Sequence, residues 1–153
     1  MVKNRTESIL RNNLSRFKGH WYFLKLQVNS FAFTRSPADF IVLNSKGSYL
    51  VECKQIDLRK GNKFSFNRLS QENDLVNFQL ISMPENVAWL FFGFIQKSFK
   101  ESQFFLIPFS EFQKVRFLCA KRQFFDLEEF NKYFFTCRLY PEKGGVLRIE
   151  EYL

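Results

Sequence analysis

The stretch "SPADFIVLNSKGSYLVECKQ", residues 36–55, decides the fold of this chain. It contains two apolar runs, at residues 40–43 and 49–51, on either side of the turn-forming sequence "SKG" at residues 45–47. Apolar runs of strand length that flank a short polar turn with a glycine are typical of a β-hairpin. We therefore predict two antiparallel strands here.

Three ionisable side chains lie at one end of this hairpin. Asp39 stands directly before the first apolar run, and Glu52 and Lys54 follow the second. Side chains two positions apart in a strand share a face, so Glu52 and Lys54 point to the same side and Cys53 points to the other. The apolar neighbours indicate that these polar groups sit at the ends of core strands.

The turn decides which residue Asp39 faces. If Ser45-Lys46 form a two-residue turn, Asp39 lies opposite Glu52; if Lys46-Gly47 form it, Asp39 lies opposite Lys54. Either tight turn places all three ionisable groups on one face. Directly opposed side chains have Cβ atoms roughly 4.5–5.5 Å apart, a spacing at which like charges repel. The two carboxylates are therefore expected to need a cation.

Mg²⁺ suits such a pair of acids, because it takes oxygen ligands from one or two carboxylates, waters and a substrate phosphate. A lysine beside the ion can orient or help deprotonate an attacking water and can neutralise charge on a phosphate. The trio Asp39, Glu52 and Lys54 thus predicts metal-assisted phosphodiester hydrolysis with Mg²⁺, for which Mn²⁺ can substitute. The alternative is a cross-strand acid and lysine on a solvated hairpin face.

The remaining elements place the hairpin in a layered structure. Apolar periodicity predicts helices and strands on both sides of it, and a polar, basic loop directly after it. The fold class is therefore α/β (α+β), with one mixed sheet flanked by helices. The predicted elements are a helix at 4–16, a strand at 20–28, the hairpin, a loop at 55–63, a helix in the second half of 64–81, strands at 87–95 and 103–109, short helices at 110–118 and 126–134, and a closing strand within 144–153.

The length and composition indicate one domain over residues 1–153. No window offers the ~20 uninterrupted apolar residues of a membrane helix, and residues 1–13 lack the apolar core of a signal peptide. The three cysteines leave an odd thiol in any disulfide scheme, which favours free, buried thiols in a reducing cytoplasm. We expect a cytoplasmic protein that does not interact with membranes.

The net charge of +8 favours a phosphate-rich partner, although a solubilising coat or an acidic protein partner would also explain it. The 22 phenylalanines fall mostly at core spacings, so they indicate a core and not a platform for stacked bases. Basic side chains around the hairpin are candidates for contacts to a nucleic-acid backbone, each with a solvated loop as its alternative. These are Arg35, Arg59, Lys60, Lys63 and Arg68.

The "PAD" and "ECK" elements resemble the motif of the PD-(D/E)xK nuclease superfamily. The predicted order of helix, three strands, helix and strand is similar to that superfamily's restriction-endonuclease-like core, here with a short C-terminal extension. Within it, the chain resembles Holliday junction resolvases of the RecU type and of the archaeal Hjc type. The further likenesses are Glu7 in "NRTESIL", Ser36 before the Pro-Asp element, "FSFNRLSQENDLVNF" at 64–78, and the C-terminal "LRIEEYL".

This resemblance implies roles for individual residues. Asp39 and Glu52 would be metal ligands, the backbone carbonyl of Cys53 a third, and Lys54 the catalytic lysine. Glu7 would contact the metal directly or through water, unless it is only an acid in the first turn of a helix, where the macrodipole favours it. The catalytic helix amide of the superfamily would be Gln71 or, two positions later, Asn73; either could otherwise be a surface amide. Ser36 would join the residues that bind DNA.

The resemblance implies a Mg²⁺-dependent endonuclease that resolves four-way DNA junctions in recombination and repair. Such an enzyme is expected to be a homodimer whose two-fold symmetry matches the junction. Three alternatives stay open: a restriction-like or repair endonuclease that cuts duplex or branched DNA, a nucleic-acid-binding module of the same fold without catalysis, and a purely structural partner-binding domain. Cleavage of linear duplex, and the dependence of binding on salt, separate these hypotheses.

Overall fold

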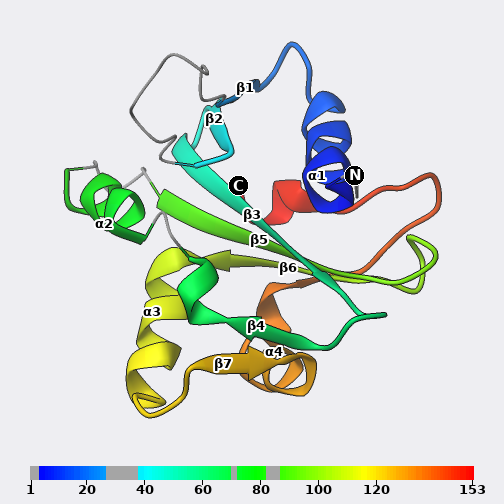
Figure 1. Ribbon diagram of the computed structural model, residues 1–153. Helices are drawn as coiled ribbons and strands as arrows, with labels where there is room; N and C mark the ends of the chain where they lie inside the picture. Colours follow the sequence, from blue (N-terminus) through cyan, green and yellow to red (C-terminus); the bar gives the residue numbers. More distant parts are fainter. Residues whose placement is uncertain (1–3, 27–37, 70–71, 82–86) are drawn as a thin grey trace, which may run out of the picture.

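The computed structural model describes residues 4–26, 38–69, 72–81 and 87–153 (Figure 1). Its centre is a six-stranded sheet with the strand order β1-β2-β3-β5-β6-β8. Only the β3–β5 pair is parallel among these strands, and the other neighbours are antiparallel, so the sheet is mixed. The strands are β1 (Tyr22–Lys25), β2 (Phe40–Asn44), β3 (Gly47–Asp57), β5 (Val87–Ile95), β6 (Gln103–Pro108) and β8 (Arg138–Leu139).

Helices cover both faces of this sheet, which confirms the predicted fold class. Helix α1 and the C-terminal segment lie on one face, while α3, α4 and a small second sheet lie on the other (Figure 1). The helices are α1 (Arg5–Ser15), α2 (Glu72–Ile81), α3 (Phe109–Leu118) and α4 (Leu127–Tyr133), with 3-10 turns η1 (Phe66–Arg68), η2 (Phe135–Cys137) and η3 (Ile149–Glu151). The small sheet pairs β4 (Lys63–Ser65) with β7 (Phe124–Asp126).

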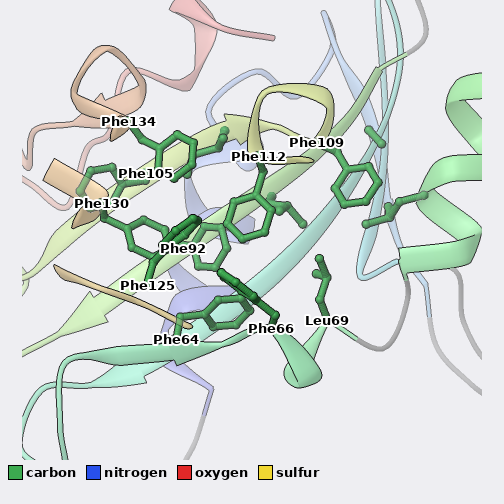
Figure 2. Packing of buried hydrophobic residues seen from close by; sticks show 14 of the residues in the cluster. Phe64, Phe66, Leu69, Phe92, Phe105, Phe109, Phe112, Phe125, Phe130 and Phe134 are labelled. Atoms are coloured by element: carbon green, nitrogen blue, oxygen red, sulfur yellow. The ribbon is translucent and has the colours of Figure 1, made fainter. Parts of the chain in front are cut away.

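Phenylalanine rings fill the layer between the central sheet and the face that carries α3 and α4. Figure 2 shows Phe112 of α3 among rings from the central sheet, the small sheet and α4. Each buried aromatic ring removes a large apolar area from water, so this cluster is a main source of stability. The predicted core role of these residues is confirmed for Phe64, Phe66, Phe92, Phe94, Phe105, Phe109, Phe112, Phe125, Phe130 and Phe134.

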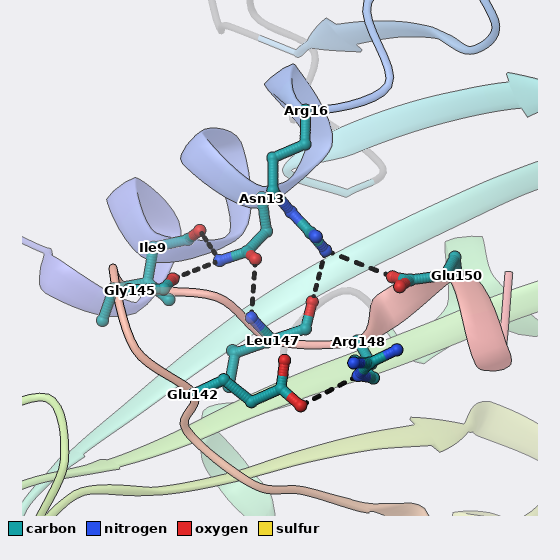
Figure 3. A network of polar contacts seen from close by, with 8 residues as sticks. All are labelled: Ile9, Asn13, Arg16, Glu142, Gly145, Leu147, Arg148 and Glu150. Atoms are coloured by element: carbon teal, nitrogen blue, oxygen red, sulfur yellow. Dashed lines mark hydrogen bonds and ion pairs between the residues drawn. The ribbon is translucent and has the colours of Figure 1, made fainter.

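A polar network ties α1 to the C-terminal segment on the opposite face (Figure 3). The buried Asn13 side chain donates to the carbonyl of Gly145 at 3.1 Å and accepts from the backbone N–H of Leu147 at 2.7 Å. Arg16 donates to the carbonyl of Leu147 at 2.7 Å and to Glu150 at 3.1 Å. Because these bonds pair backbone groups that no strand satisfies, they fix α1 over the sheet.

The expected strand within 144–153 is wrong. The C-terminal strand of the central sheet is β8, and the chain after it turns at Gly144 and Gly145, whose φ angles are +80° and +79°. The backbone N–H of Leu147 then bonds to the Asn13 side chain and not to a neighbouring strand. The apolar side chains of this segment are buried under α1 all the same, which explains their strand-like spacing.

The polar loop expected at 55–63 is also partly wrong, since β3 continues to Asp57 and β4 begins at Lys63. Residues 55–57 pair with residues 93–95 of β5, and Ile56 is buried. The backbone pairing with β5, which is apolar throughout, therefore extends β3 beyond its apolar run at residues 49–51. The small β4–β7 sheet was not expected, because its partner segments lie about sixty residues apart in sequence.

Two further expectations concern the cysteines and membranes. All three cysteines are free thiols, as predicted, and Cys53 is buried; the expected burial is wrong for Cys119 and Cys137, which are only partly buried. Among the described residues, no helix combines the length and apolar character needed to cross a bilayer.

Candidate active site

The hairpin register places Asp39 beside Glu52. Phe40 pairs with Val51, and the pairing runs on to Asn44 and Gly47, so the two-residue turn is Ser45-Lys46. The Asn44 side chain fixes this turn by accepting the backbone N–H of residues 46 and 47 at 2.8 and 3.2 Å. One position beyond the last strand pair, this register sets Asp39 opposite Glu52, which is the first of the two arrangements that the sequence allowed.

Asp39 is anchored by backbone groups on both sides. Its N–H donates to the carbonyl of Val51 at 3.1 Å, and its own carbonyl accepts from Leu26 at 2.8 Å. Its Oδ2 accepts the backbone N–H of Cys53 at 2.7 Å. The carboxylate is thus bonded to the residue that lies between Glu52 and Lys54, so its position relative to both is set by the backbone.

Glu52 is buried in the sheet, with 2% of its surface exposed. Its Oε1 lies 2.8 Å from Nζ of Lys54, whose side chain is 12% exposed. Its Oε2 is buried without a hydrogen-bond partner among the residues that the structure describes. A buried carboxylate oxygen that is left unpaired costs free energy, so this oxygen favours a partner beyond those that the described residues supply.

The electrostatics of the pair favour a bound cation. Burial, with the nearby charge of Asp39, raises the pKa of Glu52 to about 7, even though Lys54 opposes the change. Burial also raises the pKa of Asp39, against the lowering effect of the Cys53 N–H. Burial raises the pKa of the Cys53 thiol as well, and its side chain packs on the opposite face.

Glu7 approaches from α1, whose N-terminus Asn4 caps by accepting the Glu7 N–H at 3.1 Å. Glu7 Oε1 lies 2.7 Å from Nζ of Lys25 on β1, and its charge contributes to the raised pKa of Asp39. Glu7 is therefore near the acid pair but is held by a lysine. Its role as a metal ligand stays a prediction.

Two residues that sequence reasoning missed hold this helix in place. Gln55, which follows the Glu-x-Lys element, points to the opposite face and accepts the Thr6 N–H at 3.0 Å and the Thr6 hydroxyl at 3.2 Å. Lys25 pairs with Glu7 from the edge strand. The position of Gln55 directly after Lys54 could have indicated its role from the sequence. No sequence feature could have indicated the role of Lys25, because its contact with Glu7 depends on how α1 packs.

The residues present fit a hard divalent cation. Asp39 and Glu52 offer carboxylate oxygens on one face, and one of these oxygens is buried and unpaired. Over the described parts of the chain, no three His, Cys, Asp or Glu side chains are gathered into a complete metal cage. A site with two carboxylates and the remaining positions left to water and phosphate is the usual arrangement for Mg²⁺.

The remaining predicted site residues are dispersed. Gln71, Arg35 and Ser36 lie outside the described residues, and the alternative Asn73 is an exposed residue of α2. Arg68 donates to the backbone carbonyl of Gln55, the residue after Lys54, at 2.8 Å. Arg59 pairs with Asp57 at 2.8 Å, Lys60 is exposed, and Lys63 lies over the Phe124 ring. The DNA contacts of all these basic residues and of Ser36 stay predictions.

The parent protein is expected to lose stability as the pH rises from about 4.5 to about 7, and the Glu52→Gln variant is expected not to show this loss. The native pKa of Glu52, about 7, lies above its ordinary value of 4.5, so the native state binds the proton more tightly. Its contribution is therefore present below about pH 4.5 and is lost as the pH rises to about 7. In EDTA, the free energy of unfolding of the parent should fall by about 1–3 kcal/mol relative to Glu52→Gln between those limits. Urea unfolding at several pH values measures this, and parallel curves would contradict it.

Comparison with known proteins adds one structural likeness. No protein-family model matches the sequence, and no curated protein matches it. Among solved structures, the chain is similar to Hjc, a Holliday junction resolvase from Archaeoglobus fulgidus, an archaeal hyperthermophile. The likeness covers 71% of this chain and 76% of that chain, with 17% sequence identity and a TM-score of 0.45. At that distance, the chemistry of the site has to be read from its own geometry.

Proposed function

We propose that this protein is a divalent-metal-dependent endodeoxyribonuclease whose site is formed by Asp39, Glu52 and Lys54. The observation that carries the proposal is Oε2 of Glu52, which is buried and has no hydrogen-bond partner among the described residues, on a carboxylate that also bonds to an ammonium at 2.8 Å. The Lys54 ammonium satisfies only Oε1, and a divalent cation would satisfy the buried Oε2 as well. The neighbouring Asp39 supplies the second acid.

Each side chain has a distinct role in phosphodiester hydrolysis. A bound Mg²⁺ would act as a Lewis acid towards the phosphate and would lower the pKa of a water. Asp39 and Glu52 would hold it, with Asp39 kept in place by the Cys53 N–H. Lys54 orients Glu52 and presents a positive charge where the phosphate becomes more negative.

The proposed substrate is branched DNA, in particular the four-way junction. The resemblance of the "PAD" and "ECK" elements to junction resolvases and the net charge of +8 support this choice. A homodimer would present two such sites, related by a two-fold axis, to the two strands that must be cut symmetrically. In that form the protein would act in DNA recombination and repair.

The test uses a labelled four-way junction and a linear duplex of the same arm sequence, each with and without Mg²⁺. We expect the parent to cut the junction only with metal, and Asp39→Asn to bind it in EDTA with unchanged affinity but not to cut it. Equal cutting of linear duplex would favour a restriction-like or repair enzyme. Binding without cutting by the parent, with Mg²⁺ or Mn²⁺, would leave a non-catalytic module and overturn the proposal.

A further inference from the structure

Two adjoining hollows lie away from the Asp39–Glu52–Lys54 site and together form one groove. The larger has a volume of about 630 Å³ and the smaller about 400 Å³, and Glu72, Arg116 and Arg122 line both. The groove runs from η1 across the side of α3 to the residues that precede β7. In Figure 1, the turn that directly follows β4, which is η1, lies beside the N-terminal part of α3.

The lining of the groove has more cations than acids, and two of its three cations are held in place. Its described lining contains Lys114, Arg116 and Arg122 against one acid, Glu72. Arg116 lies over the Phe66 ring at 4.7 Å and bonds to Glu72 at 2.7 Å. A guanidinium has five N–H donors, so one such bond leaves donors that can face a phosphate.

Arg122 is held in the same manner. It bonds to Glu129 of α4 and lies over the Phe124 ring at 4.9 Å. Arg116 and Arg122 are thus each fixed by a ring and an acid, which offsets part of their charge but leaves preorganised guanidinium N–H donors along the groove. Such preorganised donors favour a linear polyanion, because few side chains have to be ordered when it binds.

Phe117 distinguishes this groove from an ordinary basic surface. It lines the larger hollow and is 81% exposed, although ten other phenylalanines are packed in the core of this face. An exposed ring beside fixed cations matches the chemistry of an unpaired nucleic-acid strand, whose bases stack on aromatic rings while its phosphates bind arginine and lysine. Bases in a continuous duplex are already stacked and cannot use Phe117.

The groove also leads towards the proposed cleavage site. Arg68 of η1 stands between two lining residues, Asn67 and Leu69, and donates to the carbonyl of Gln55 at 2.8 Å. Gln55 directly follows Lys54 in β3. Arg68 therefore connects η1, at one border of the groove, to the C-terminal half of β3, in which Glu52 and Lys54 lie.

We propose that this groove binds an unpaired DNA strand, with a base stacked on Phe117 and phosphates on Lys114, Arg116 and Arg122. The inference deepens the proposed nuclease function and rests on it for DNA as the partner. It adds to the four-way junction a second class of branched substrate, DNA in which paired and unpaired segments meet. The other occupant that an exposed ring could suit, a second copy of this chain, is an outcome of the test.

The test measures fluorescence anisotropy in EDTA, with a labelled single strand of about twelve nucleotides and with a blunt duplex. Phe117→Ala should weaken single-strand binding about 5- to 50-fold and leave duplex binding within about twofold. Phe135→Ala removes another exposed ring, 67% exposed and outside the groove, and should change neither affinity. Unchanged single-strand binding by Phe117→Ala, or an equal loss in Phe135→Ala, would overturn the proposal.

Two further measurements separate the alternatives. Lys114→Gln should lower the slope of log affinity against log salt by about 1, while Lys143→Gln, outside the groove, should not. Light scattering gives the molar mass of the parent and of Phe117→Ala, and conversion of a dimer into a monomer by Phe117→Ala would overturn the proposal in favour of self-association. Junction cleavage by Phe117→Ala at saturating enzyme reports on the nuclease function separately, because loss of groove binding leaves Asp39, Glu52 and Lys54 intact.

Discussion

Lys54→Ala should reduce the single-turnover rate of junction cleavage by about 10²- to 10⁴-fold, while binding in EDTA stays within about twofold. The reason is where the ammonium lies. Nζ of Lys54 is 2.8 Å from Oε1 of the buried Glu52, and only 12% of the Lys54 side chain is exposed. Removing the ammonium takes away both the charge that faces the phosphate and the group that orients Glu52. Such losses act on the transition state more than on the bound substrate.

The matched control is Lys46→Ala, which removes an exposed lysine from the turn of the same hairpin. It should cut at the parental rate, because Lys46 lies at the far end of both strands. Thermal unfolding of both variants shows whether the hairpin is intact. A Lys54→Ala variant that cuts as fast as Lys46→Ala would remove Lys54 from the mechanism.

Gly93→Ala should destabilise the protein by about 1–3 kcal/mol, because α1 packs directly against the glycine backbone. A Cβ at Gly93 would lie 2.3 Å from the Thr6 hydroxyl oxygen and 2.9 Å from its methyl group. Thr6 is fully buried and bonded to Gln55, so it cannot turn away. The helix itself would have to shift, and it carries Glu7.

A double-mutant cycle isolates this contact. Thr6→Ala alone loses its hydroxyl contact to Gln55, and Gly93→Ala alone introduces the clash. The combined Thr6→Ala/Gly93→Ala variant should lose less free energy of unfolding than the sum of the two, because the clashing atoms are gone. Strict additivity, or a Gly93→Ala variant as stable as the parent, would show that α1 does not depend on this close approach.

The local part of the site could be predicted from the sequence, because it follows from the two-residue period of a strand. Glu52 and Lys54 share a face by that rule, and Asp39 joins them through a tight turn. The sequence left two registers open, however. What favours Ser45-Lys46 is a side-chain contact, in which the amide oxygen Oδ1 of Asn44 accepts from the backbone N–H groups of Lys46 and Gly47. Composition alone does not show such a contact.

The non-local part could not be predicted. The approach of α1 depends on Gly93, which is 87 positions away from Thr6, and neither residue belongs to a recognisable motif. The strand predicted in the C-terminal segment was wrong for a similar reason. Its apolar spacing fits a strand, but the backbone N–H of Leu147 donates to the Asn13 side chain and not to a neighbouring strand. Phe117 likewise resembles the core phenylalanines in sequence, and only packing shows that it is exposed.

The most direct measurement is an anomalous difference map from crystals of the protein soaked in Mn²⁺. A peak within about 2–2.5 Å of carboxylate oxygens of both Asp39 and Glu52, absent from crystals of Glu52→Gln, is the predicted result. If Mn²⁺ supports cleavage but the peak lies elsewhere, or if the cleaving enzyme shows no peak at this pair, the hairpin is not the metal site.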